Sequence, residues 1–154
     1  MKIIALWGRQ NTGKTTTLKM VYNKLKAKGY SLLLKPDENE RDFYAIFEID
    51  GIKVGLFTGG DNASCLDEPF KAFLEAECVI CITASRVRRT RNGSVKFLEG
   101  IKNNDIIWHR KAVIYSSHNG VVTNPVDEQN EVNKIQADFV IKELNRQIPI
   151  ILKG

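Results

Sequence analysis

The chain has 154 residues, of which 43% are hydrophobic and 27% charged, and its formal net charge is +5. A chain of this size and composition can bury a core without disulfides or metal ions, which excludes disorder, collagen-like sequence and a coiled coil. No apolar run approaches the roughly 20 residues that span a bilayer, and residues 1–7 lack the length and cleavage site of a signal peptide. We therefore expect a single domain over residues 1–154, cytoplasmic and without membrane contact.

The three cysteines are expected to be reduced thiols, because their number is odd and no signal peptide precedes them. Cys78 and Cys81 have the C-x-x-C spacing of zinc ligands, but no second C-x-x-C or H-x-x-x-H pattern follows. Both lie in an apolar run. Core thiols are therefore the preferred interpretation, with zinc as the alternative.

Positive charge is concentrated in residues 86–111. This window holds eight Lys or Arg against two Asp or Glu, a net charge of +6, which leaves about −1 for the rest of the chain. A local basic cluster indicates a polyanion nearby, either nucleic acid or the phosphates of a small substrate.

In chain order, residues 2–7 are an apolar run typical of a buried strand. Residues 14–28 form a helix, since apolar residues recur there at helical spacing (Leu18, Val21, Tyr22 and Leu25). Gly29 ends this helix, and residues 31–35 are a short strand. Two further strands, at residues 43–50 and 52–58, meet at Asp50-Gly51, which predicts an antiparallel hairpin because such a tight turn needs positive φ.

Helices and strands alternate in the second half of the chain. Helices are expected at residues 66–76, 94–102 and 126–146, and strands at residues 78–84, 111–116 and 148–152. Ile106, Ile107 and Trp108 are interpreted as a buried edge, and Val132, Ile135 and Phe139 as one stripe of the long helix. The alternation predicts an α/β fold with a mostly parallel sheet covered on both faces. Ligands bind beyond the carboxyl ends of such strands, in the loops that follow residues 7, 58, 84 and 116.

The loop after the first strand has the residues of a phosphate cradle. Residues 8–15 read Gly-Arg-Gln-Asn-Thr-Gly-Lys-Thr, the pattern G-x-x-x-x-G-K-[ST]. Gly8 and Gly13 let the backbone wrap inward, so that successive N–H groups point at an anion, and the N-terminus of the following helix adds its partial positive charge. Here the chain resembles the P-loop NTPase superfamily.

This resemblance implies a three-layer P-loop NTPase fold, a nucleoside triphosphate such as ATP, and Mg²⁺. Lys14 would reach the β- and γ-phosphates, the Thr15 hydroxyl would hold Mg²⁺, and Thr16 would contact the α-phosphate. The rest of the nucleotide site would be Gly8, Asn11, Thr12 and Gly13. An ordinary glycine-rich turn is the alternative.

A phosphate cradle of this kind needs a carboxylate at the end of another strand, to hold Mg²⁺ or act as a base. Asp61 is the preferred residue, because it follows the strand at residues 52–58 and two glycines. A capping role on the surface is the alternative for Asp61. Asp37 and Asp42, in the loop after the second strand, are the other candidates for the metal or catalytic carboxylate.

The arginines that follow the strand at residues 78–84 suit phosphate oxygens, because the guanidinium donates as a planar fork. In P-loop kinases a short arginine-rich lid stabilises the transferring phosphoryl group. By that resemblance Arg86 and Arg88 are the candidate catalytic arginines, alongside Lys14 and Asp61. A solvated basic loop and a nucleic-acid contact are the alternatives.

These features predict an ATP-dependent phosphotransferase or NTPase that acts on a small phosphate acceptor. A nucleotide-dependent regulatory module is one alternative, and an ATPase that binds nucleic acid through residues 86–111 is another. A guanine-nucleotide switch is disfavoured, because neither D-x-x-G nor N-K-x-D occurs where such proteins have them.

Overall fold

The computed structural model describes residues 1–86, 92–118, 121–123 and 125–154. Its elements, in chain order, are β1 (Lys2–Gly8), α1 (Lys14–Ala27), β2 (Ser31–Leu34), β3 (Tyr44–Ile49), β4 (Ile52–Phe57), α2 (Ser64–Glu75), β5 (Ile80–Arg86), α3 (Ser94–Gly100), β6 (Asp105–Arg110), β7 (Ser116–His118), β8 (Val121–Thr123) and α4 (Val126–Lys153).

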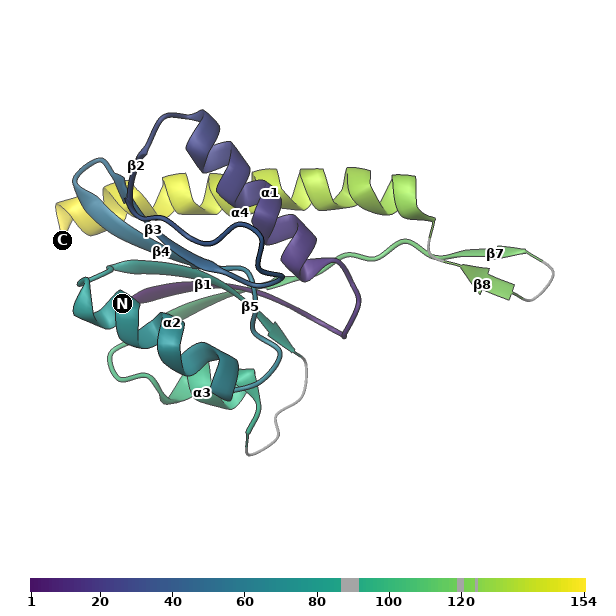
Figure 1. Ribbon diagram of the computed structural model, residues 1–154, viewed down its shortest axis with the longest axis horizontal. Coiled ribbons are helices and arrows are strands. Elements are labelled where there is room, and N and C mark those ends of the chain that lie inside the picture. The colour runs from purple at the N-terminus through teal and green to yellow at the C-terminus, as the bar shows by residue number, and fades with distance from the viewer. Residues whose placement is uncertain (87–91, 119–120, 124) are drawn as a thin grey trace.

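Six strands form the main sheet, in the order β2-β3-β4-β5-β1-β6. The pairings β4–β5, β5–β1 and β1–β6 are parallel, whereas β2–β3 and β3–β4 are antiparallel. Only β3 therefore runs against the other five strands. Helices α1 and α4 cover one face and α2 and α3 cover the other, which makes three layers (Figure 1). The expected α/β fold with a mostly parallel sheet is confirmed.

Two buried clusters hold the layers together, one on each face of the sheet. On the α1 and α4 face, residues at helical spacing on α1 (Leu18, Val21, Tyr22 and Leu25) pack against the sheet and against Leu144 of α4. On the opposite face, Phe70 and Phe73 of α2 pack against Ile3 of β1 and Leu98 of α3. Burying aliphatic and aromatic side chains on both faces is what a sheet of parallel strands requires.

The hairpin of β3 and β4 is confirmed, with Tyr44 opposite Phe57 and Ile49 opposite Ile52. Its two turn residues have positive φ angles, 51° at Asp50 and 80° at Gly51, as a two-residue turn between twisted strands requires.

The strand expected at residues 111–116 is wrong. The last strand of the main sheet is β6, which begins six residues earlier and pairs with β1 from Asp105 to Arg110. It contains the three apolar residues interpreted as a buried edge, and these are only partly buried because β6 is the outer strand of the sheet. Residues 116–118 do form a strand, but it pairs with residues 121–123 as a separate hairpin that projects from the body (Figure 1).

The expected strand at residues 148–152 is also wrong, because α4 continues to Lys153. Ile148 lies at helical spacing from Ala137, Ile141 and Leu144, and all four are buried, so helical packing continues through this segment. The expected apolar stripe of α4 is not its buried face: Ile135 and Phe139 are 55% and 57% exposed. The buried face instead begins with polar residues, Gln129 and Asn133.

Cys78 and Cys81 lie in the core beneath α2 and α3. Burial raises the pKa of Cys78 to about 11 and raises the pKa of Cys81 as well. Zinc binds the thiolate form, so burial opposes the zinc alternative.

No helix within the described residues combines the length and apolar character that crossing a bilayer demands.

The two faces of α4 can be compared by truncating one residue on each. Leu144→Ala should lower the free energy of unfolding by about 2–5 kcal/mol, because it leaves a cavity in the core. Phe139→Ala should lower it by less than about 1 kcal/mol, because most of that ring is already in water. Urea unfolding measures both, and a larger loss for Phe139→Ala would contradict the observed face.

Candidate functional site

The glycine-rich loop (residues 8–15) joins β1 to α1 at the carboxyl end of the sheet. Asn11 and Gly13 adopt left-handed backbone conformations, with φ of 57° and 82°, and these reverse the chain tightly enough for its N–H groups to turn inward. A Cβ at position 13 would lie 2.9 Å from Oδ1 of Asn133. Glycine is therefore needed at position 13 for its conformation and also for the close approach of α4.

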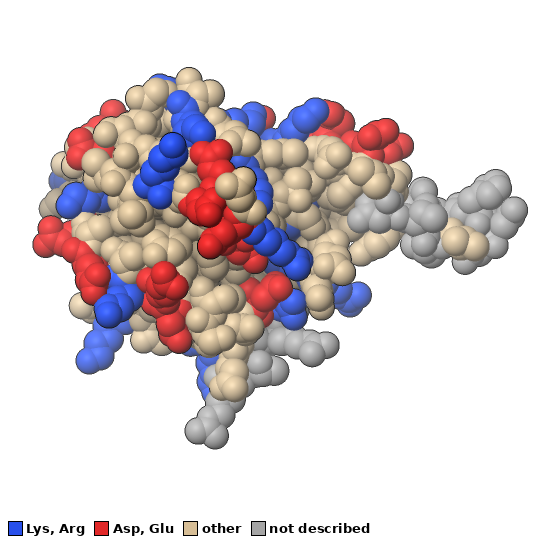
Figure 2. Space-filling model, viewed as in Figure 1, with Lys and Arg blue, Asp and Glu red and all other residues tan. Residues whose placement is uncertain are grey.

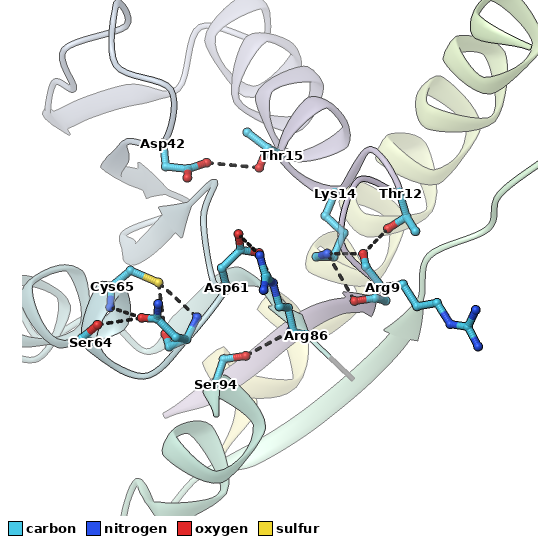
Figure 3. A network of polar contacts seen from close by, with 12 residues as sticks. Arg9, Thr12, Lys14, Thr15, Asp42, Asp61, Ser64, Cys65, Arg86 and Ser94 are labelled. Carbon is cyan, nitrogen blue, oxygen red and sulfur yellow. Dashed lines mark hydrogen bonds and ion pairs between the residues drawn. The ribbon is translucent and has the colours of Figure 1, made fainter. Parts of the chain in front are cut away.

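Lys14 is folded back onto this loop and only 6% of it is exposed. Its Nζ donates hydrogen bonds to the backbone oxygens of Gly8, at 3.2 Å, and Arg9, at 2.7 Å. Thr12 Oγ1 donates to the same Arg9 oxygen at 2.9 Å (Figure 3). Burial lowers the pKa of Lys14, opposed by the charge of Asp61 and assisted by that of Arg86. An ammonium group has three donors, so one remains for a ligand.

Thr15 is paired with a carboxylate from a different loop. Its Oγ1 donates to Oδ1 of Asp42 at 3.1 Å (Figure 3). The loop that carries Asp42 is tied to α1, because Glu38 accepts hydrogen bonds from Tyr22, at 2.8 Å, and Lys26, at 2.7 Å. These bonds lower the pKa of Glu38, and the ion pair with Lys26 holds the loop against α1.

Asp61 lies in the same region, but its carboxylate forms an ion pair with an arginine. Arg86 donates to both of its oxygens, through Nε at 2.8 Å and Nη2 at 2.6 Å. This bidentate pair lowers the pKa of Asp61. Gly60 makes the approach possible: its φ is 145°, and a Cβ there would lie 1.8 Å from the backbone oxygen of Ala84, so no other residue fits against β5.

Arg86 is the last residue of β5, and Gly8 is its register partner on β1. The backbone N–H of Arg86 donates to Ser94 Oγ at 3.0 Å, and Ser94 Oγ lies 2.9 Å from Ser85 Oγ. The first turn of α3 therefore fixes the end of β5 beside the glycine-rich loop. The other candidate arginine, Arg88, lies outside the described residues.

Two cavities open on either side of the glycine-rich loop. The first, of about 640 Å³, contains both carboxylates together with Lys14 and Thr15. Its lining residues are Gln10, Asn11, Thr12, Gly13, Lys14, Thr15, Thr16, Lys19, Met20, Asn23, Arg41, Asp42, Gly59, Asp61 and Ala84. We call it the carboxylate cavity.

The second cavity, of about 700 Å³, has no carboxylate among the described residues that line it, which are Trp7, Gly8, Arg9, Thr12, Arg110, Lys111, Ala112, Val113 and Tyr115. We call it the aromatic cavity, after Trp7 and Tyr115. The Arg110 guanidinium lies 5.9 Å from the centre of the Trp7 ring. The lining therefore combines aromatic rings with three cations.

Lys111 is the most buried of these cations, with 4% of it exposed. Its Nζ donates to the backbone oxygen of Ala112 at 2.7 Å. Burial lowers its pKa to about 8, with a further contribution from the positive charge of Lys14.

Amide side chains of α4 hold the backbone that follows β6. Gln129 accepts a hydrogen bond from the Ile114 N–H at 3.0 Å and donates to Asn133 at 3.1 Å. Gln136 bonds the backbone of Arg110 and Ala112. Buried polar groups need such partners, and here the partners join α4 to both sides of the glycine-rich loop.

Among the described residues, no group of three His, Cys, Asp or Glu could hold a metal ion unaided. The donors that do converge are the hydroxyl of Thr15 and the carboxylate of Asp42. One or two protein oxygens completed by water and phosphate suit Mg²⁺, so the residues present fit this ion. Asp61 fits it less well, because its two oxygens already accept from Arg86.

The described part of the basic window, Arg86 and residues 92–111, does not form one exposed basic face. Arg86 is paired with Asp61 and Lys111 is buried, and residues 87–91 lie outside the described part of the chain. On the face shown in Figure 2, basic and acidic side chains are interspersed. On that face, the described residues form no continuous basic patch that would suit nucleic acid.

The site gathers most of the residues expected from the sequence and adds others. Asp42, a secondary candidate in the sequence, is the carboxylate in contact with Thr15, whereas Asp37 bonds only the backbone of its own loop, at Asn39. Lys111 belongs to the basic window expected to meet a polyanion, but no sequence pattern singles it out from the other cations there. Gln129 and Asn133 could have been noticed, because they are polar residues in helical register with Ala137.

Comparison with protein-family models, with curated proteins and with solved structures finds no match for this chain, so the functional argument depends on the geometry of the site.

Proposed function

We propose that this chain is a Mg²⁺-dependent nucleoside triphosphate-binding protein of the P-loop type, which transfers or hydrolyses the terminal phosphate of ATP. The observation that carries the proposal is the buried Lys14 inside the glycine-rich loop, at the N-terminus of α1, beside the paired Thr15 and Asp42. This arrangement concentrates positive charge and inward-facing N–H groups on one small volume. A polyphosphate is the ligand that suits it.

The two cavities suggest how the nucleotide would lie. The aromatic cavity offers Trp7 and Tyr115, whose rings suit a planar base, and it has cations for phosphate. The carboxylate cavity offers the oxygens that a Mg²⁺-bound terminal phosphate needs. The glycine-rich loop lines both cavities, so a triphosphate would lie along it with its nucleoside end in the aromatic cavity.

Thr15 and Asp42 are the residues that would hold Mg²⁺, whose chemistry when bound is to neutralise charge on the terminal phosphates. Lys14 Nζ would give up a hydrogen bond to a loop carbonyl and donate to phosphate oxygens instead. Arg86 uses two of its five N–H donors on Asp61, and the other three remain for the phosphoryl group. In this proposal Asp61 is a positioning residue that orients Arg86.

The carboxylate cavity extends along α1 beyond the place proposed for the terminal phosphate. This leaves room for a second substrate, which favours phosphoryl transfer over simple hydrolysis. Thr16, Lys19, Met20 and Asn23 follow helical spacing there, and Arg41 joins them from the loop before β3. The two cations favour a small acceptor that itself carries negative charge.

Lys14→Met should weaken ATP binding by about 10–150-fold, because a charge-assisted hydrogen bond in a buried site is lost. Lys24→Met is the matched control, since Lys24 lies on the same helix but is bonded to Asp138 at the surface. Calorimetric titration measures both. Equal affinities for the two variants would remove the basis of the proposal.

Asp42→Asn and Asp61→Asn should separate metal binding from arginine positioning. Mg²⁺ should raise the ATP affinity of the unaltered chain at least tenfold, and Asp42→Asn should abolish this increase. Asp61→Asn should keep that gain but slow turnover, as should Arg86→Gln, and the double variant should be no slower than Arg86→Gln alone. The reverse pattern would assign Mg²⁺ to Asp61.

Turnover in the presence of different acceptors tests the type of reaction. ATP consumption should rise at least several-fold with a small phosphorylated or carboxylated acceptor, and a phosphorylated product should appear by ³¹P NMR. Stimulation by DNA or RNA, with no acceptor effect, would instead support the nucleic-acid alternative. Consumption unchanged by either class would indicate a simple NTPase.

A further inference from the structure

Lys111 is the one buried residue among the three cations of the aromatic cavity, and the proposed function gives it no individual role. It follows the last residue of β6, and its backbone N–H donates to the Trp7 oxygen on β1 at 2.7 Å. Its Cβ would lie 3.0 Å from a Cβ at position 8, so its side chain starts directly behind the first glycine of the glycine-rich loop. From there it lines the aromatic cavity.

The groups around this amine do not neutralise it. Its only hydrogen-bond partner among the described residues is the Ala112 oxygen. Arg9 and Arg110 line the same cavity, and Lys14 is close enough to lower the pKa of Lys111. From α4, the neutral amides of Gln129 and Gln136 bond the backbone on either side of Lys111, at Ala112 and Arg110. A buried ammonium without a carboxylate is costly, so the position is one that an anionic ligand would stabilise.

We propose that Lys111 is a second phosphate-binding residue, whose amine passes from the Ala112 oxygen to a phosphate of the bound nucleotide. This inference rests on the proposed function, since it concerns the same ligand. It adds that Lys111 binds the phosphate chain from the aromatic cavity, opposite Lys14, and that nucleotide affinity falls in mildly alkaline solution.

The proton linkage follows from the surroundings of the amine. Without an anion the pKa of Lys111 is about 8, so the amine is increasingly neutral above that pH. A phosphate alongside favours the charged form and raises the pKa again. Binding above pH 8 must therefore take up a proton, and affinity must fall as pH rises.

The test is calorimetric titration of the whole chain with ATP between pH 7.5 and 9.5, repeated in two buffers of different ionisation enthalpy. Phosphate esters are fully ionised there, because their second pKa is about 6. The unaltered chain should lose affinity by on the order of 20-fold across this range, and it should take up nearly one proton per ATP at pH 9.5.

Two variants assign the effect to this residue. Lys111→Arg keeps a charge that cannot be lost, so its affinity should stay constant with pH and proton uptake should vanish. Lys111→Met should bind about tenfold or more weakly at pH 7.5, again without uptake. Thermal unfolding checks that each variant is folded. If Lys111→Met does not fold, Lys111→Arg alone tests whether ATP binding is linked to proton uptake by Lys111.

The outcomes separate this inference from the proposed function. No ATP binding by the unaltered chain at any pH would overturn both. Binding that Lys111→Met leaves unchanged would overturn the role of Lys111 alone. Proton uptake that persists in Lys111→Arg would assign the titrating group to Lys14 and overturn the inference as well.

Discussion

The site depends on one constraint: two buried lysines must be held close together beside the glycine-rich loop. Lys14 and Lys111 approach the glycine-rich loop from opposite sides, and burial lowers the pKa of both. The partial positive charge of α1 adds to theirs. Desolvated like charges repel strongly. The two amines are held by hydrogen bonds to backbone oxygens, and the charge of Asp61 also stabilises charged Lys14. An anion small enough to enter would relieve that repulsion, which supports the proposal that a phosphate binds at the loop.

The parts of the fold that local sequence determines could be predicted. The strand, glycine-rich loop and helix at the start of the chain are contiguous, and the apolar spacing of α1 fits a single buried face. The turn at Asp50 and Gly51 depends only on two adjacent φ angles. The positions of Lys14 and Thr15 at the end of the glycine-rich loop follow from the local sequence for the same reason, whereas their roles toward a nucleotide belong to the proposal.

The remaining features depend on tertiary contacts that no local pattern encodes. Asp61 is bound by Arg86 because β5 lies between β4 and β1, and strand order is not visible in the sequence. Asp42 meets Thr15 because hydrogen bonds to Glu38 fold the preceding loop onto α1. A sequence pattern can identify carboxylates near strand ends, but it cannot tell which one is already neutralised by an arginine.

Two errors in the second half of the chain, the strand expected at residues 111–116 and the apolar stripe expected on α4, have one cause, which is the polar N-terminal end of α4. Gln129 and Asn133 occupy positions that an ordinary amphipathic helix would fill with apolar residues, so the apolar stripe was expected on the wrong face. Gln129 and Gln136 also bond the backbone at residues 112 and 114, which satisfies polar groups that a strand would otherwise pair. Residues 112–115 therefore do not pair with the sheet, and Ala112, Val113 and Tyr115 line the aromatic cavity. Where local rules fail together in a well-packed chain, a functional demand is the usual reason, and here the failures surround Lys111 and the glycine-rich loop.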